Sequence, residues 1–164
     1  MPEKMNEIKV VNVRLVQEQS LYTSDPIHTP MEAARVIMNE LCKYDREVLM
    51  VANMTTKGRI INMNMVSMGT INASLVEPRE FFKSAVLSNA AAVMAFHNHP
   101  SGDPTPSKED IAITRRLKEI GDLTGIHLMD HIIVGANDPS NYVSMMEQGY
   151  ITENKKPERK EKSL

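Results

Sequence analysis

The feature that most limits the fold is a run of six apolar residues, AAVMAF at 91–96, set between two segments with helical character. A short run that is apolar at every position is typical of a strand buried on both of its faces. The preceding segment, residues 78–90, begins with a proline, which is favoured in the first turn of a helix. The following segment, residues 107–123, is also expected to be helical. The chain therefore predicts a sheet whose central strand is 91–96, flanked by helices.

Other segments extend this pattern. The stretch HTPMEAARVIMNELCKY, residues 28–44, opens with Thr29 and Pro30 and keeps apolar residues at helical spacing, which predicts a helix of about 12 residues. Residues 7–18, EIKVVNVRLVQE, are rich in β-branched residues and roughly alternate, which predicts a strand. Together these elements predict an α/β protein, a mixed sheet with helices packed on its faces. The remaining strands are expected at residues 46–54, 59–69, 126–135 and 141–145, the first two joined by the turn TTKG.

The length of 164 residues fits one domain with a proper core. Three regions are expected: an N-terminal strand and connection at 1–27, the folded domain at 28–151, and a tail at 152–164. The tail contains ENKKPERKEKSL, a charged run that is expected to be disordered. Glycine-rich phosphate-binding patterns are absent from the sequence, so nucleotide binding has no support.

Charge and cysteine content limit the partners and the compartment. The formal net charge of −2 gives no electrostatic reason to expect nucleic acid or an anionic membrane surface as a partner. The single cysteine excludes an intramolecular disulfide and fits a reducing compartment. The apolar stretches are far too short to span a membrane, and no signal peptide is recognisable. We therefore expect a soluble cytoplasmic protein.

Three residues around the end of the central strand suggest a metal site. His97 and His99 are separated by one residue, so on an extended strand their imidazoles point to the same side. Asp110 follows eleven residues after His99, in the first turn of the helix expected to begin at Ser107, and the loop between can bring it back. Two imidazoles and a carboxylate suit Zn²⁺ with one position left for water, whose pKa such a site lowers to about 7.

Each of these residues also has a structural interpretation. Ser107 and Asp110 fit a capping box, in which the aspartate would only serve the helix N-terminus. The two histidines taken alone could be polar turn residues, and the metal site is favoured only by their combination with Asp110. A metal-dependent hydrolase also needs a proton carrier. Glu47, at the start of an apolar strand, is the best placed upstream carboxylate, although a surface residue could occupy the same position.

The residues His97, His99, Pro100, Ser107 and Asp110 match the JAMM motif, H-x-H-P-x6-S-x2-D, of the JAB/MPN metalloprotease superfamily. The stretches HNHPSGDPTPSKEDIAITRRLKEIGDLTGIHLMDHIIVG and GTINASLVEPREFFKSAVLSNAAAVMAFHNHP closely resemble its bacterial RadC-like branch. The resemblance covers roughly residues 28–147 and implies the α/β sandwich that JAB/MPN domains share with cytidine deaminases. The deaminase signature, H-x-E with P-C-x-x-C, is missing, which argues against base deamination.

The resemblance also implies roles for individual residues. It implies that His97, His99 and Asp110 hold a zinc ion. By register, Glu47 matches the family's glutamate, which hydrogen-bonds the zinc water and shuttles its proton. Ser107 would stabilise the oxyanion of a tetrahedral intermediate. Two further residues match the family pattern, Asp130 and His131, which could orient a ligand from the second shell or be purely structural.

These observations favour a zinc-dependent hydrolase of amide bonds, with a peptide or protein as substrate. Two alternatives stay open: a DNA-associated RadC-type accessory domain with a non-catalytic zinc site, and a metal-dependent phosphodiesterase. RadC-like proteins commonly carry an N-terminal helical domain for which this chain has no room, so a role in DNA repair is not implied. The sequence predicts neither the physiological substrate nor the oligomeric state.

Overall fold

The structure is a computed structural model that describes residues 9–18, 27–69, 76–135, 138 and 140–152. Its helices and strands follow the order expected from the sequence between residues 28 and 151. They are α1 (Pro30–Leu41), β1 (Val48–Met54), β2 (Ile60–Met68), α2 (Pro78–Leu87), β3 (Ala92–Asn98), α3 (Lys108–Thr124), β4 (His127–Val134) and β5 (Tyr142–Ser144).

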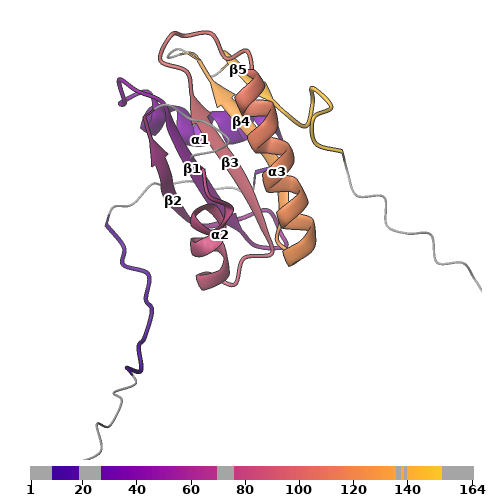
Figure 1. Cartoon of the computed structure of the whole chain (residues 1–164). Coiled ribbons are helices and arrows are strands. Elements are labelled where there is room, and N and C mark those ends of the chain that lie inside the picture. The colour runs from indigo at the N-terminus through magenta and orange to yellow at the C-terminus, as the bar shows by residue number, and fades with distance from the viewer. Residues whose placement is uncertain (1–8, 19–26, 70–75, 136–137, 139, 153–164) are drawn as a thin grey trace, which may run out of the picture.

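The strands form one mixed sheet in the order β2-β1-β3-β4-β5 (Figure 1). The strand β3, which contains the apolar run 91–96, lies in the middle, antiparallel to β1 and parallel to β4. The pairs β1–β2 and β4–β5 are antiparallel. The predictions of a central strand, of a hairpin across the TTKG turn and of a short edge strand near the C-terminal end are therefore confirmed.

The helices lie on both faces of the sheet, as predicted. The helix α1 packs on one face, where its apolar side chains join those of β1, β3 and β4 in one core cluster. The helices α2 and α3 cover the other face and form a second cluster with the same strands. Every residue of β1 and β3 is buried, which explains why these strands lack the alternation of a strand with one solvated face.

The prediction of a strand at residues 7–18 is wrong for the part that the structure describes. Residues 9–18 form no helix or strand, and all ten are exposed. The sequence indicates a segment able to form a strand, but β propensity reflects packing on a neighbouring strand and is not sufficient alone. Residues 7–8 and 153–164, which include most of the predicted tail, lie outside the described residues.

Candidate metal centre

The two histidines lie at the carboxyl end of the central strand. His97 is the penultimate residue of β3 and is fully buried, whereas His99 follows the strand and is half-buried. The backbone N–H of His99 donates to the carbonyl of Val134 at 2.8 Å, so the pairing with β4 continues through His99. Their ring centroids are 4.7 Å apart. The two imidazoles therefore share one side of the strand, as their spacing predicts.

Asp110 returns to the histidines from the first turn of α3. Its Oδ1 lies 3.3 Å from Nδ1 of His97, and its Oδ2 lies 3.3 Å from Nε2 of His99. The capping box is also present: Asp110 Oδ2 accepts from the Ser107 backbone N–H at 2.7 Å, and Ser107 Oγ accepts from the Asp110 N–H at 3.1 Å. The two interpretations of Asp110 are thus compatible, because the cap fixes the carboxylate where it faces both imidazoles.

Glu47 approaches the histidines from the start of β1. Leu49 pairs with His97 in the sheet, and continuing this antiparallel register places Glu47 across from His99. One ligand atom from each of Glu47, His97 and His99 lies within 4.8 Å of the other two, a spacing that could hold a metal ion. Two imidazoles and two carboxylates, those of Asp110 and Glu47, therefore converge at this end of the sheet.

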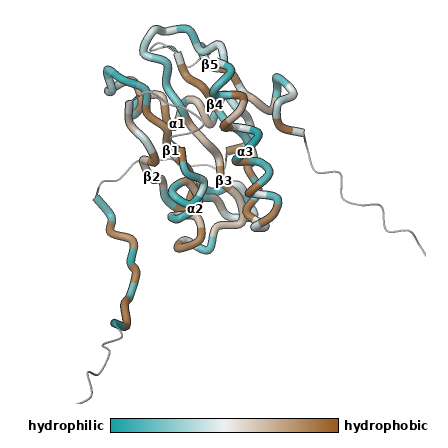
Figure 2. The backbone as a smooth tube through the Cα atoms, viewed as in Figure 1, coloured by the Kyte–Doolittle hydropathy of each residue, from teal (hydrophilic) through white to brown (hydrophobic). Residues whose placement is uncertain are grey.

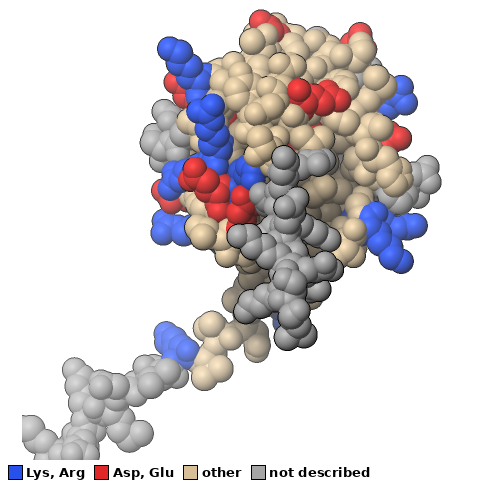
Figure 3. All heavy atoms as spheres, turned by 90° about the vertical axis from the view of Figure 1, so that its right-hand side faces the viewer, with Lys and Arg blue, Asp and Glu red and all other residues tan. Residues whose placement is uncertain are grey.

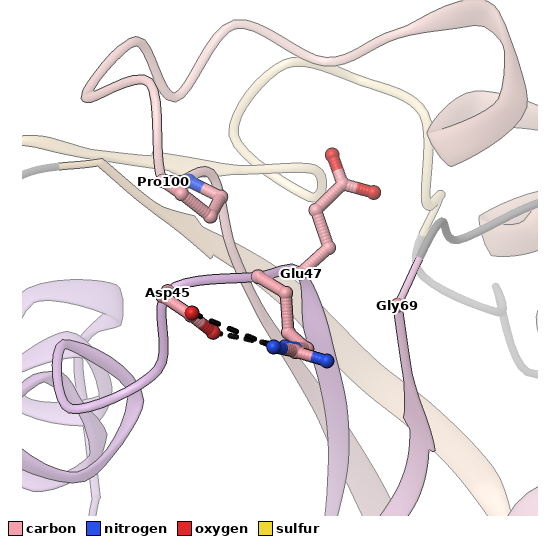
Figure 4. Close-up of a pocket in the computed structure, with 5 residues that line it drawn as sticks. Asp45, Glu47, Gly69 and Pro100 are labelled. Atoms are coloured by element: carbon pink, nitrogen blue, oxygen red, sulfur yellow. Dashed lines mark hydrogen bonds and ion pairs between the residues drawn. The ribbon is translucent and has the colours of Figure 1, made fainter.

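A surface cavity of about 410 Å³ opens beside these residues, lined by Asp45, Arg46, Glu47, Gly69 and Pro100. Asp45 and Arg46 form an ion pair in which Oδ1 of Asp45 lies 2.8 Å from Nε of Arg46. In Figure 4 the Glu47 side chain points away from this ion pair. The backbone N–H of Gly69 donates to the Glu47 carbonyl at 2.8 Å and fixes the position of that residue. Of the two carboxylates, Glu47 is thus the one in contact with the cavity.

The hydrogen bonds of His99 determine which of its ring nitrogens can bind a cation. Its Nδ1 lies 2.7 Å from the carbonyl oxygen of Asp103, which only accepts, so Nδ1 must carry the hydrogen. In neutral His99 the lone pair of Nε2 then faces the carboxylate oxygen Oδ2 of Asp110. Two electron-rich atoms repel each other, so a proton or a cation between them is favourable. Accordingly, the hydrogen bond with Asp110 raises the pKa of His99, against the effect of burial. A metal ion could replace the proton of His99 at this position.

His97 is suited to a cation for a different reason. Burial lowers its pKa to about 3, aided by the positive charge that His131 would carry, so the imidazole is neutral at pH 7. Neither ring nitrogen has a hydrogen-bond partner within the part of the chain that the structure describes. A buried polar group without a partner costs stability, and the neutral imidazole is the form that binds zinc. The residues present therefore fit a bound metal ion.

The carboxyl group of Asp110 is held in its charged form. Burial alone would raise its pKa, but the hydrogen bonds with His99 and Ser107 outweigh this effect and lower the pKa of Asp110 below its usual range. Asp110 is only 2% exposed. A buried carboxylate beside two imidazoles supplies the negative charge that a divalent cation needs.

His131 lies next to the histidine pair and is connected to Asp110 through α3. Its ring stacks on that of His97 at a centroid distance of 5.9 Å. The Thr114 hydroxyl donates to the Asp110 carbonyl at 2.7 Å, so His131 Nδ1, also 2.7 Å from this hydroxyl, must be the donor to it. Burial lowers the pKa of His131 to about 4, and the ring is neutral. His131 thus lies against His97 and is joined through Thr114 to the backbone of Asp110.

Asp130, the other residue that matches the family pattern, does not face the histidine pair. As the strand neighbour of His131 it projects to the opposite face of β4, where its Oδ2 accepts from the Ser144 hydroxyl at 2.5 Å. Its Oδ1 accepts from the backbone N–H groups of His131 and Met146, at 2.7 and 3.0 Å. Burial raises the pKa of this carboxyl. These contacts attach β5 and the residues after it to β4, on the face of β4 opposite to the candidate metal-binding residues.

Two residues of the site were missed by sequence reasoning. Asn98, between the histidines, accepts a hydrogen bond from Val48 N–H and donates one to the Arg46 carbonyl, on the two sides of Glu47. The other is Thr114, which joins His131 to Asp110. An amide between two candidate ligands at a strand end was a signal that could have been used. Thr114 is one turn after Asp110 on the same helix face, a weaker signal.

The charged surface and the helices give no further indication of the partner. On the face seen in Figure 3, basic and acidic side chains both occur and most of the surface carries neither. Among the described residues, every helix is too short or too polar to cross a membrane.

Comparison with known families shows which family the sequence resembles. The sequence model of the RadC-like JAB domain family matches residues 27–150, a range that contains all the strands and helices described above. The residues of the metal centre, from Glu47 to His131, all lie inside the match.

Several curated proteins are similar over the same region, all called UPF0758 protein, a name that states no activity. The protein of Desulfitobacterium hafniense is 43% identical over 134 residues, covering 79% of this chain and 58% of the relative. That of Clostridium beijerinckii is 46% identical over 125 residues, 76% of this chain and 53% of the relative. A Clostridium botulinum protein is 48% identical over 125 residues, which cover 76% of this chain and 54% of the relative. The chain thus spans little more than half the length of these relatives.

Proposed function

Because this chain belongs to the RadC-like JAB domain family, we propose that it is a zinc-dependent hydrolase of amide bonds in peptides or isopeptides. One observation carries the proposal: two imidazoles and the buried carboxylate of Asp110 converge beside a surface cavity that a second carboxylate, Glu47, lines. Such a set would suit a bound metal, with the cavity available to a substrate and Glu47 as a candidate proton carrier.

We assign the metal ligands to His97, His99 and Asp110. Nitrogen and oxygen donors in this ratio suit zinc with an open coordination position. When bound, the ion would supply Lewis-acid polarisation of a substrate carbonyl and a lowered pKa for a water molecule. The neutral His97, the orientation of His99 by the Asp103 carbonyl and the fixing of Asp110 by Ser107 all prepare these donors before any ion binds.

We assign Glu47 as the proton carrier. Hydrolysis adds water across the amide C–N bond, so one proton must leave the water and one must reach the departing amine. Glu47 is half-buried and lines the cavity, whereas Asp110 is buried and fully engaged with Ser107 and the histidines. Glu47 can therefore accept the proton of the attacking water and return it to the leaving nitrogen, while the charge of Asp110 stays in place.

Ser107 can contribute a hydrogen bond to the reacting carbonyl. Its Oγ accepts from the Asp110 backbone N–H at 3.1 Å, which leaves the hydroxyl hydrogen for another acceptor. The residue is exposed and begins α3 on the side of the metal ligands. The hydroxyl would stabilise the negative charge that develops on the carbonyl oxygen in the transition state.

The substrate we propose is a peptide or protein, hydrolysed in the cytoplasm. The cavity is lined in part by the exposed residues Asp45, Arg46 and Pro100, so it lies at the surface and is accessible to a chain segment.

The proposal is tested by metal analysis and substrate screening of the tag-free protein. We expect about one zinc per chain, as the single open site implies, and zinc-dependent cleavage of a peptide or isopeptide panel. The same panel should remain uncut by Glu47→Gln protein that still holds its metal. Well-folded protein that contains no metal and takes up no added zinc would contradict the proposal.

A further inference from the structure

The sheet has one long edge, the strand β2. In the sheet order β2 and β5 are the two outer strands, and β2 spans Ile60–Met68 whereas β5 spans only Tyr142–Ser144. Residues 60–69, IINMNMVSMG, contain no charged residue and no proline. Proteins usually protect long edge strands with such residues, because an exposed edge offers backbone groups to any further strand.

The face of β2 on the side of α1 is incompletely covered. The helix α1 lies over β3, β4 and β5. On this side of the sheet Met63 and Met65 of β2 are only half-buried at the border of the core. An additional strand along β2 would extend the sheet and could cover these two side chains.

A segment suited to this position occurs in the same chain. Residues 9–18, KVVNVRLVQE, which we call the arm, lie outside the sheet and are exposed. In an extended strand Val11, Val13 and Leu15 would share one face, and the other face would carry Asn12 and Arg14 together with two valines, Val10 and Val16. The three apolar side chains are 75%, 67% and 49% exposed. One face of the arm is therefore apolar at three successive positions, and the part of this chain that the structure describes supplies no partner that buries it.

The position of the arm favours a partner outside the chain. In Figure 1 the arm lies beyond the β2 side of the sheet and runs away from the folded body. Figure 2 shows hydrophobic and hydrophilic positions interspersed along it. Ile27, where the chain enters the domain, is hydrogen-bonded to Gly58 in the turn before β2, with Ile27 N and Gly58 O 3.2 Å apart. The arm is thus tethered at one end of the open edge.

We propose that the arm of one chain pairs as an additional strand with the β2 edge of a second copy, and that two copies exchange arms to form a dimer. In this pairing Val11, Val13 and Leu15 lie against Met63 and Met65 of the other copy. Reciprocal exchange of an identical element is an economical route to a symmetric dimer, since both interfaces use the same two surfaces. The dimer does not depend on the proposed hydrolase activity, and the arm lies outside the residues of the family match.

The test is the molar mass of the full chain by light scattering over a range of concentrations. Wild-type protein is expected at twice the chain mass. The variant Val13→Lys places a charge on the apolar face of the arm and should weaken the dimer about tenfold or more, because the charge would be buried in the interface. The matched control is Val16→Lys, an equally polar change on the opposite face, where the valine is 83% exposed. This control should remain dimeric.

Hydrogen exchange identifies the surface involved. The amides of β2 should exchange more slowly in the wild-type dimer than in Val13→Lys protein, while those of β3 should not differ. A wild-type monomer at every concentration overturns the proposal, and so does a dimer that Val13→Lys leaves intact. A monomer whose arm amides are protected would mean that the arm folds back on its own β2, which also overturns pairing with a second copy.

Discussion

Asn98 fixes the backbone on both sides of Glu47. Its Oδ1 accepts a hydrogen bond from Val48 N–H at 2.6 Å, and its Nδ2 donates to the Arg46 carbonyl at 3.0 Å. Asn98 lies between the two candidate metal-binding histidines on β3, so a single amide couples the strand that carries the ligands to the residue that we assign as proton carrier. The distance between Glu47 and the candidate metal position thereby depends on the Asn98 side chain.

Replacing Asn98 by alanine should therefore lower turnover more than metal binding. Loss of one buried and one partly buried hydrogen bond is expected to cost about 2 kcal/mol of the free energy of unfolding. A displacement of Glu47 by about 1 Å can reduce turnover by up to about 100-fold. The measurement is kcat beside zinc content for the same preparation. We expect near-normal zinc content with a reduced kcat.

The control for this variant is Asn62→Ala. Asn62 also makes side-chain hydrogen bonds, to Asn53 and Ser88, but at the other end of β1 from Glu47. Asn62→Ala should lower the free energy of unfolding about as much as Asn98→Ala does, and should leave kcat unchanged. Equal effects of the two variants on kcat would mean that Asn98 acts through general stability and does not position Glu47.

The assignment of Glu47 is tested by Glu47→Gln. Glutamine keeps the size of the side chain but cannot take up the proton of water, so kcat should fall by at least about 100-fold, the contribution usual for general acid–base catalysis. The zinc content should stay that of the wild type. A matched control is Glu80→Gln, which removes an exposed carboxylate paired with Lys83 on α2.

The spacing of Glu47, His97 and His99 provides a second possible result for this variant. If Glu47→Gln protein loses zinc together with activity, Glu47 is a metal ligand and Asp110 instead orients the histidines. If it retains both zinc and full activity, the proton-carrier role is wrong.

The metal ligands are tested by His99→Ala and Asp110→Ala. Each should lower the zinc content of purified protein well below that of the wild type, since loss of one ligand of three removes much of the affinity. Elemental analysis after dialysis makes the comparison. The control is His127→Ala, an exposed histidine at the opposite end of the β3–β4 pairing from His97. Zinc that survives both ligand substitutions would place the metal elsewhere.

Much of this fold could be predicted from local patterns. The uninterrupted apolar run of β3 indicated its central place, and the prolines at residues 30 and 78 marked two helix starts. The arm shows where such patterns fail. Its alternating residues indicate a strand, but strand formation depends on a neighbour that the local sequence does not specify.

The candidate site also has a part that the sequence predicts and a part that it does not. The proximity of His97, His99 and Asp110 follows from a strand end and a helix start joined by a loop, so it could be predicted. Asn98 could not be assigned its role, because the groups it binds lie 50 and 52 residues away in the sequence. Short polar side chains that connect distant segments carry no periodic signal, and only the folded arrangement shows what they bind.

Metal-free protein should lose stability as the pH falls below about 6.5, the ordinary histidine pKa. The pKa of His97 is about 3 and that of His131 about 4 in the folded chain, both lowered chiefly by burial. Between pH 6.5 and these values the unfolded chain binds protons that the folded chain does not. Each histidine therefore reduces the free energy of unfolding by up to about 1.4 kcal/mol per pH unit.

The raised pKa values of His99 and Asp130 make the folded protein more stable as the pH falls, opposite to the effect of His97 and His131. These two groups therefore bear on the choice of pH range for the measurement. The raised pKa of His99 stabilises the fold at low pH, and this contribution is lost as the pH rises above 6.5 through the folded value. The raised pKa of Asp130 adds stability as the pH falls toward 3.8. Urea unfolding of chelator-treated protein between pH 6.5 and 5 follows the range in which His97 and His131 become protonated in the unfolded chain but stay neutral in the folded one. In this range His131→Asn should show a smaller slope than wild type, and His127→Asn an unchanged one. A wild-type stability that does not vary between pH 6.5 and 5 would mean that these two imidazoles are protonated in the folded protein, contrary to their burial.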